Sequence, residues 1–139
     1  MTDVDVREIS LEQTRVLRQA ILRPHEAVAE LAAHEPADGF AVGAFDRDAL
    51  IAVGFIAADG EAGAWRVRGM ATAPHARGQG AGAAVLQALL RHASAAGASR
   101  VWCNARLPAR AFYERAGFRV VSEEFEIPRI GAHVVMERP

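Results

Sequence analysis

One hexapeptide constrains this chain more than any other: residues 77–82 read Arg-Gly-Gln-Gly-Ala-Gly, between a strand-like run and a helix-like run. Glycine loses more backbone entropy on folding than other residues and has no side chain to pack, so repeated glycines need a physical reason. The usual reason is that the backbone approaches another group closely. At the start of a helix, where free amides and the helix dipole favour negative charge, that group is often a phosphate.

The bulk properties indicate one soluble, globular domain over residues 1–139, with 51% hydrophobic and 24% charged residues. The net charge is −1 and there is no basic block, so we expect no nucleic acid and no membrane as partners. Cys103 is the only cysteine, which excludes an internal disulfide and a metal thiolate cluster. Because no leader core or membrane-length apolar run is present, we expect a cytoplasmic protein. We also expect no bound metal.

Hydrophobic patterning predicts a mixed order of elements. Strands are expected at 3–9, 40–45, 49–58, 64–73, 100–105, 118–123 and 132–138, and helices at 10–22, 25–35, 82–96 and 108–117. Ser10 and Gln13 form a capping box at the first helix. The close spacing of the strands from 40 to 73 indicates an antiparallel meander. The predicted fold class is therefore α/β of the α+β type, with a mostly antiparallel sheet and about four helices.

Two common phosphate-binding motifs do not match the glycine loop. A Walker loop ends in Gly-Lys-Ser/Thr, and the chain contains no lysine. A dinucleotide fingerprint requires G-x-G-x-x-G, whereas residues 78–82 read Gly-Gln-Gly-Ala-Gly. A loop that simply turns the chain and a nucleotide-binding regulator are the alternatives left open at this point.

In its context the loop resembles the acyl-CoA motif of the GNAT acyltransferase superfamily, R/Q-x-x-G-x-G/A, at each specified position. The preceding "MATAP" at 70–74 resembles the family's splayed fourth strand, and "AFYERAGF" at 111–118 resembles its A-x-Y-E-K-x-G-F segment. The resemblance covers residues 40–138. It implies a sheet splayed between its fourth and fifth strands. It also implies an acetyl-CoA-dependent N-acetyltransferase that acts by direct attack of a primary amine, on a small-molecule or amino-acid-like acceptor.

The resemblance also implies where acetyl-CoA binds. The loop would hold the pyrophosphate, the fourth strand would bind pantetheine, and an amide near Ala71 or Thr72 would polarise the thioester carbonyl. Asn104 could reach pantetheine or could be an ordinary polar residue at a strand end. The implied cofactor-binding residues are Met70, Ala71, Thr72, Arg77, Gly78, Gln79, Gly80, Ala81, Gly82 and Asn104.

The same resemblance makes Tyr113 the general acid that protonates the departing thiolate. A phenol suits that role because its ordinary pKa lies near that of a thiol. The alternative is a half-buried packing residue. The general base stays open, because Arg66 stands where many relatives have a glutamate. The candidates are a water relay, Glu61, His133, Glu26 and His25.

Arg66 and Arg68 share one face of their strand, where they could bind a carboxylate or phosphate on the acceptor, or simply cover an exposed surface. His133 belongs to the segment 124–136, which could border the acceptor pocket or form only the last hairpin. Cys103 is less suited to carry an acyl group, because its strand is expected to be buried. A non-catalytic acyl-CoA-binding sensor is the alternative to an enzyme, and a homodimer stays open.

Overall fold

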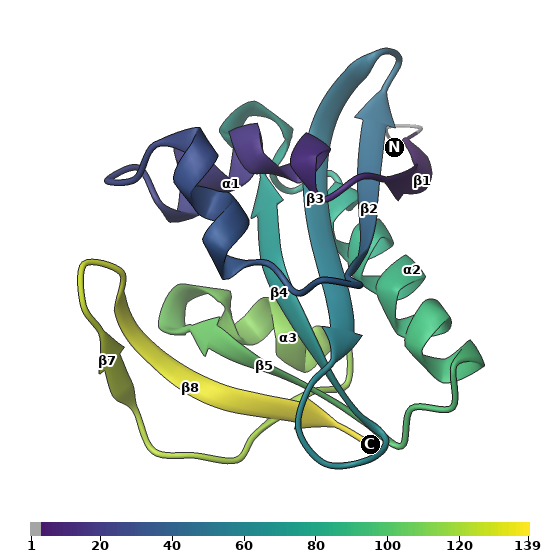
Figure 1. The fold of residues 1–139 in the computed structure, drawn as a ribbon, viewed down its shortest axis with the longest axis vertical. Helices are drawn as coiled ribbons and strands as arrows, with labels where there is room; N and C mark the ends of the chain where they lie inside the picture. The colour runs from purple at the N-terminus through teal and green to yellow at the C-terminus, as the bar shows by residue number, and fades with distance from the viewer. Residues whose placement is uncertain (1–3) are drawn as a thin grey trace.

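The computed structural model describes residues 4–139 and shows an eight-stranded sheet in the order β1-β2-β3-β4-β5-β8-β6, with β7 also paired to β8 (Figure 1). The strands are β1 Asp5–Ile9, β2 Phe40–Asp46, β3 Ala49–Ala58, β4 Ala64–Thr72, β5 Arg100–Arg106, β6 Arg119–Val120, β7 Phe125–Ile127 and β8 Gly131–Arg138. The β4–β5 pair is parallel and the other pairs are antiparallel. The predicted fold class is confirmed.

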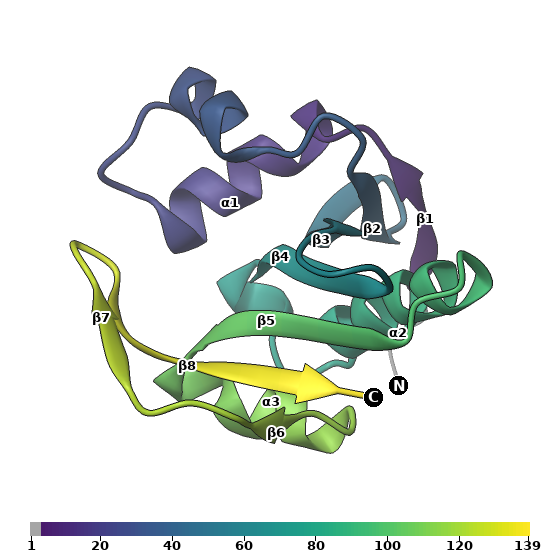
Figure 2. The same ribbon diagram turned by 60° about the horizontal axis from the view of Figure 1, so that its bottom comes forward.

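Helices cover both faces of the sheet (Figure 2). The elements are η1 Glu12–Thr14, α1 Arg15–Leu22, η2 Val28–His34, η3 Pro74–Ala76, α2 Ala81–Ala95, η4 Leu107–Ala109 and α3 Arg110–Arg115, where η denotes a 3-10 helix. α1 and η2 lie on one face, and α2 and α3 lie on the other. The Ser10 amide donates to Gln13 Oε1 at 2.8 Å and the Gln13 amide donates to Ser10 Oγ at 3.1 Å, which confirms the predicted capping box.

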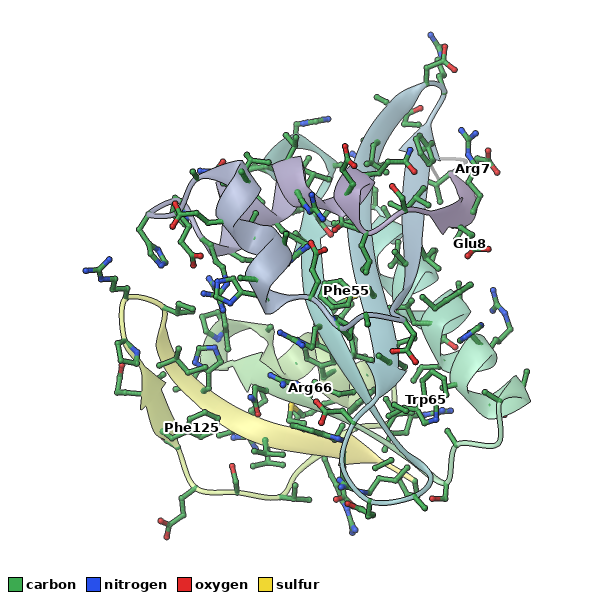
Figure 3. All side chains as sticks on the ribbon, in the orientation of Figure 1. Arg7, Glu8, Phe55, Trp65, Arg66 and Phe125 are labelled. Atoms are coloured by element: carbon green, nitrogen blue, oxygen red, sulfur yellow. The ribbon has the colours of Figure 1, made fainter. Side chains whose placement is uncertain are left out.

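Apolar alternation along the strands gives each face its own core. On one face, Val85 and Leu89 of α2 pack with residues of β2 to β4 in the larger cluster of buried side chains. On the other face, Phe55 of β3, labelled in Figure 3, packs with a second cluster that includes Leu17 and Ile21 of α1. Because α1 covers only the β1 to β4 half, the face of β5 and β8 on that side remains free to border a cavity (Figure 2).

The predicted splay between β4 and β5 is present. The two strands pair only where Ala64–Arg66 lie beside residues 100–102. Farther along, the register between β3 and β4 shifts, and Gly69 takes a left-handed φ of +68°. A Cβ at Gly69 would lie 2.5 Å from Phe55 Cε1, so glycine is needed at this irregularity. The irregular part of β4 coincides with its separation from β5.

Three predicted elements differ from the structure. The predicted helix 25–35 is the 3-10 helix Val28–His34, bracketed by two prolines that restrict the backbone on either side. The predicted strand 118–123 is reduced to Arg119–Val120, because Ser122 Oγ accepts the Val135 amide at 2.8 Å in place of a continued main-chain ladder. The connection after it contains the additional strand β7. The first predicted strand starts at Asp3, which lies outside the described residues.

Candidate active site

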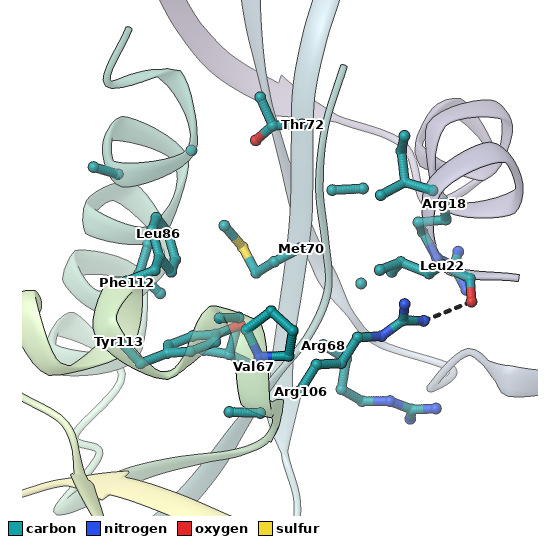
Figure 4. Close-up of a pocket in the computed structure, with 18 of the residues that line it drawn as sticks. Arg18, Leu22, Val67, Arg68, Met70, Thr72, Leu86, Arg106, Phe112 and Tyr113 are labelled. Carbon is teal, nitrogen blue, oxygen red and sulfur yellow. Dashed lines mark hydrogen bonds between the residues drawn. The ribbon is translucent and has the colours of Figure 1, made fainter. Parts of the chain in front are cut away.

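A cavity of about 870 Å³ opens where β4 and β5 separate (Figure 4). Its walls come from β4, β5, the loop before α2, the first turn of α2, α3, the end of α1 and the start of β8. Beyond Arg66, the edge of β4 that faces β5 has no strand partner in the described part of the chain. Main-chain groups of β4 are therefore available to a ligand in the splay.

The glycine loop lies at one end of this cavity and opens into it. Gly78 and Gly80 have left-handed φ values of +79° and +84°, and Gly80 is the N-cap residue of α2. A Cβ at either position would meet no described atom within 4 Å, so the space beside the loop is empty of protein. No side chain of the described residues caps α2, and its first turn has no acidic residue. Its free amides and dipole are thus suited to a phosphate group.

Nearly all of the predicted cofactor-binding residues line the cavity. They are Met70, Ala71, Thr72, Arg77, Gly78, Gly80, Ala81, Gly82 and Asn104. Gln79 is the exception and does not belong to the cavity wall. Gly82 has a different use from the other loop glycines, because a Cβ there would lie 3.0 Å from Thr72 Oγ1. Gly82 therefore allows α2 to pack closely against β4.

Tyr113 lies in the wall on the α3 side, only 7% exposed. Its ring makes edge contacts with Phe112 at 5.1 Å and Phe118 at 5.4 Å between centroids. Within residues 4–139 its hydroxyl makes no hydrogen bond. Burial, with a smaller effect from Cys103, raises the pKa of Tyr113. The phenol therefore stays protonated and has an unused donor.

Positive charge dominates the cavity. The arginines in its wall are Arg18, Arg23, Arg66, Arg68, Arg77, Arg106 and Arg115, and no aspartate or glutamate of the described residues belongs to it. The sequence analysis named Arg66, Arg68 and Arg77, but not the rest. A partial signal existed for Arg106, which directly follows a predicted buried strand. For Arg18 and Arg23, only the packing of α1 over the sheet shows that they reach the cavity.

Both predicted acceptor arginines line the cavity, in different surroundings. The Arg66 guanidinium lies 4.9 Å from the Trp102 ring centroid and 3.5 Å from Asp59 Oδ2, and its Nε is buried without a partner in the described chain. Arg68 donates to the main-chain oxygen of His34 and lies 5.7 Å from the Phe55 ring centroid.

His133 is the one residue among the predicted base candidates that lines the cavity. It is buried, and its Nδ1 lies 2.8 Å from the carbonyl oxygen of Gly131. Because a carbonyl only accepts, Nδ1 carries a proton, and in the neutral form of the ring Nε2 is the nitrogen that has the lone pair. His34, which sequence analysis missed, also lines the cavity, and its Nε2 contacts Glu26 Oε1 at 2.7 Å.

The other base candidates lie outside the cavity wall. Glu61 pairs with Arg100 at 2.9 Å in the turn between β3 and β4. Hydrogen bonds from Arg23 and His34 lower the pKa of Glu26 to about 2, which makes it a weak base. His25 lies 3.4 Å from the same carboxylate.

Cys103 is buried on the core side of β5 and is absent from the cavity wall. Burial raises the pKa of its thiol to about 12. A thiol in this state has very little of the thiolate form that attacks acyl groups. This position favours direct attack by the acceptor over an acyl-cysteine step.

Within residues 4–139, no helix has the length and apolar character needed to span a membrane. No group of three or more histidine, cysteine, aspartate or glutamate side chains there is arranged to hold a metal ion.

The cavity in the split sheet has an uncapped, glycine-rich helix start at one end and a buried phenol in its wall, which is the arrangement expected of an acyltransferase. The sequence profile of the acetyltransferase (GNAT) family matches residues 4–118. The chain belongs to the acetyltransferase (GNAT) family. The resemblance drawn from the glycine loop is confirmed, and so is the prediction of an acyltransferase.

Similar proteins agree with this assignment. The uncharacterised N-acetyltransferase YitI of Bacillus subtilis (strain 168) is 36% identical over 140 residues, covering 96% of this chain and 94% of YitI. Ribosomal-protein-S18-alanine N-acetyltransferase from Escherichia coli has a similar fold, with a TM-score of 0.79, 16% identity and coverage of 99% and 94%. An aminoglycoside 6′-N-acetyltransferase complexed with coenzyme A gives a TM-score of 0.80 at 12% identity, with 96% of each chain covered.

Proposed function

We propose that this protein is an acetyl-CoA-dependent N-acetyltransferase that acetylates the primary amine of a small-molecule or amino-acid-like acceptor by direct attack. The observation that carries the proposal is the continuity of one cavity from the uncapped start of α2 to the hydroxyl of Tyr113. When bound, acetyl-CoA supplies the thioester whose acetyl group is transferred. The empty space beside Gly78 and Gly80 fits its pyrophosphate.

The chain's own residues divide the work along this cavity. Loop 77–82 binds the pyrophosphate, with Arg77 adding a charge-assisted contact. The unpaired edge of β4 holds the pantetheine arm, and an amide near Ala71 or Thr72 polarises the acyl carbonyl. Asn104 lines the same stretch and can add a polar contact to the arm.

Two side chains handle the protons. Nε2 of His133 accepts the proton that the amine loses as its C–N bond forms. Tyr113 donates a proton to the sulfur as the C–S bond breaks. Because burial raises the pKa of Tyr113, the tyrosinate left behind is strongly basic, and the proton held by His133 can return to it through solvent. Both residues are then restored to their starting forms.

A glycine pair at the two ends of α2 tests the binding part of this proposal. Gly80→Val would place a side chain in the space assigned to the pyrophosphate, at a φ of +84°. Gly97→Val is the matched control, because Gly97 has a φ of +90° and equally open surroundings at the other end of the helix. Both variants carry similar backbone strain, but only Gly80→Val should weaken acetyl-CoA binding, by about ten- to a hundredfold if charged hydrogen bonds are lost.

Isothermal titration calorimetry with acetyl-CoA gives the dissociation constants of the wild type and both variants. Equal affinity in Gly80→Val and Gly97→Val would reject the assignment of the loop. Release of free CoA in the presence of a panel of primary amines then separates an enzyme from a non-catalytic acyl-CoA sensor. A sensor would bind acetyl-CoA and release no CoA with any amine.

A further inference from the structure

The cavity has a second charged region, on the face of the sheet that α1 covers. Arg68 of β4 and Arg106 of β5 belong to its wall there. Arg68 lies beside Phe55 in the cluster packed against α1, and Arg106 Nη2 donates to the carbonyl oxygen of Leu22 at 2.6 Å. Figure 4 shows the two arginine side chains across the cavity from Tyr113. The glycine loop and α2 lie on the opposite face, so these arginines are separate from the proposed pyrophosphate site.

Arg68 and Arg106 differ from Arg18, Arg23 and Arg66 in having no ion pair with a carboxylate within residues 4–139. Their hydrogen bonds go to main-chain oxygens of His34 and Leu22. A guanidinium has five N–H donors, so one bond to a carbonyl leaves most of them unused and leaves the charge without a paired carboxylate. The carbonyl bonds fix the two guanidiniums in position without neutralising them.

The nearby carboxylates are already engaged by other arginines. Arg18 pairs with Glu35 at 2.7 Å, Arg23 pairs with Glu26 at 2.8 Å, and Arg66 lies 3.5 Å from Asp59. Among the described residues, none of these carboxylates forms an ion pair with Arg68 or Arg106, although Asp59 is near enough to Arg68 to act on its charge. The excess of positive charge on this side of the cavity is therefore a property of the folded chain.

The surroundings of Arg68 and Arg106 disfavour the charged form of both guanidiniums. Burial lowers the pKa of Arg68 and of Arg106. The positive charge of Arg66 lowers the pKa of Arg68 further, against a smaller opposing effect of Asp59, and the positive charge of Arg23 lowers that of Arg106. Like charges gathered in a half-buried space repel one another, and the repulsion is relieved when an anion enters. A guanidinium fork also matches the oxygens of a carboxylate or phosphate.

We infer that Arg68 and Arg106 form an oxyanion subsite for the acceptor, so that the preferred acceptor is a primary amine carrying a carboxylate or a phosphate. The inference rests on the proposed N-acetyltransferase function. It narrows the acceptor class, because polyamines and other cationic amines would add positive charge to a wall that already has an excess.

Matched acceptor pairs test the inference. O-phosphoethanolamine is compared with ethanolamine, and 3-aminopropanoate with 3-aminopropanamide, by CoA release at saturating acetyl-CoA. Putrescine serves as the cationic acceptor. We expect the anionic member of at least one pair to have a kcat/KM about ten- to a hundredfold higher, the range of a charge-assisted hydrogen bond. The phosphate pair and the carboxylate pair together show which oxyanion fits.

Charge-removing variants show whether the two arginines cause the preference. Arg68→Gln and Arg106→Gln should raise KM for the anionic acceptor by about tenfold or more, with KM for acetyl-CoA unchanged. Arg91→Gln, on the exposed side of α2, removes the same charge away from the cavity and should leave the preference intact. If the two arginines only tie α1 and η2 to the sheet, their variants would melt earlier and lose activity equally with anionic and neutral acceptors, which would overturn the inference.

Direct binding keeps the test independent of turnover. O-phosphoethanolamine and 3-aminopropanoate are titrated by calorimetry into protein saturated with CoA, both wild type and Arg106→Gln. The subsite is supported if either compound binds the wild type and binds Arg106→Gln more weakly. Absence of binding by both probes, or equal kcat/KM within both pairs, overturns the inference while the proposed function stands. Failure of acetyl-CoA itself to bind would overturn the proposed function, which distinguishes the two failures.

Discussion

Tyr113→Phe removes one hydroxyl from the wall of the cavity and keeps the ring. The ring is buried and packs edge-on against Phe112 and Phe118, so the variant retains those contacts. The hydroxyl has no hydrogen-bond partner in the described chain, so no protein bond is lost. The structure thus allows the predicted catalytic effect of the substitution to be measured apart from its effect on stability.

The two effects differ in size. Loss of a general acid lowers kcat by about 10²–10⁴-fold, which corresponds to roughly 3–5 kcal/mol in the activation barrier. Loss of a buried tyrosine hydrogen bond would destabilise the fold by about 1 kcal/mol, equivalent to a fall in Tm of about 3–5 °C for a chain of this length. Because the Tyr113 hydroxyl has no such bond, we expect Tm to stay unchanged or to rise slightly.

The assay combines steady-state CoA release, acetyl-CoA calorimetry and thermal unfolding on the same preparations. Phe118→Leu is the matched control, because it removes a ring from the same aromatic group without touching a hydroxyl. It should lower Tm through a loss of about 1 kcal/mol or more and change kcat little. A Tyr113→Phe variant with wild-type kcat would refute the acid role, and a marked fall in its Tm would refute our account of the unpartnered hydroxyl.

Two further predictions concern groups outside the cavity wall. Arginine and histidine hydrogen bonds hold the pKa of Glu26 at about 2, and Arg15 and Arg18 hold that of Glu35 below its ordinary 4.5. As the pH falls below 4.5 the unfolded chain binds these protons first, so the urea midpoint should decrease from there toward pH 2. Glu35→Gln should flatten this decrease and Glu124→Gln, at an exposed site, should not. Cys103→Ala should keep the wild-type kcat, and a complete loss would indicate an acyl-cysteine step instead.

Sequence reasoning predicted those parts of the candidate site that are local in the chain. The glycine loop, the start of α2 and the Tyr113 helix depend on contiguous residues whose backbone preferences are strong. The splay itself was implied by the family resemblance, and the bulge around Gly69 was not predicted. A glycine in a strand is compatible with a bulge, a bend or a close approach, so its presence does not predict which of these occurs.

The second charged region could not have been predicted in the same way. Arg106 reaches Leu22 across 84 positions of sequence, and Arg68 reaches His34 across 34. The register of β3 to β5 and the position at which α1 and η2 pack on the sheet decide which arginines have no carboxylate partner. Likewise β7 forms only because β8 has an edge free beyond β6, a property of the assembled sheet.

Because β4 and β5 pair over a short length, we expect the free energy of unfolding of this protein to depend on the ligand bound between them. Within the sheet of residues 4–139, strands β1 to β4 are joined to strands β5 to β8 only through the parallel pairing of β4 with β5, which has three residue pairs. A ligand that bonds to both strands binds the folded chain and has no comparable site on the unfolded one. At a hundred times its dissociation constant such a ligand adds about 2.7 kcal/mol to the free energy of unfolding. The amount of folded enzyme in a cell would then follow the supply of its acyl donor.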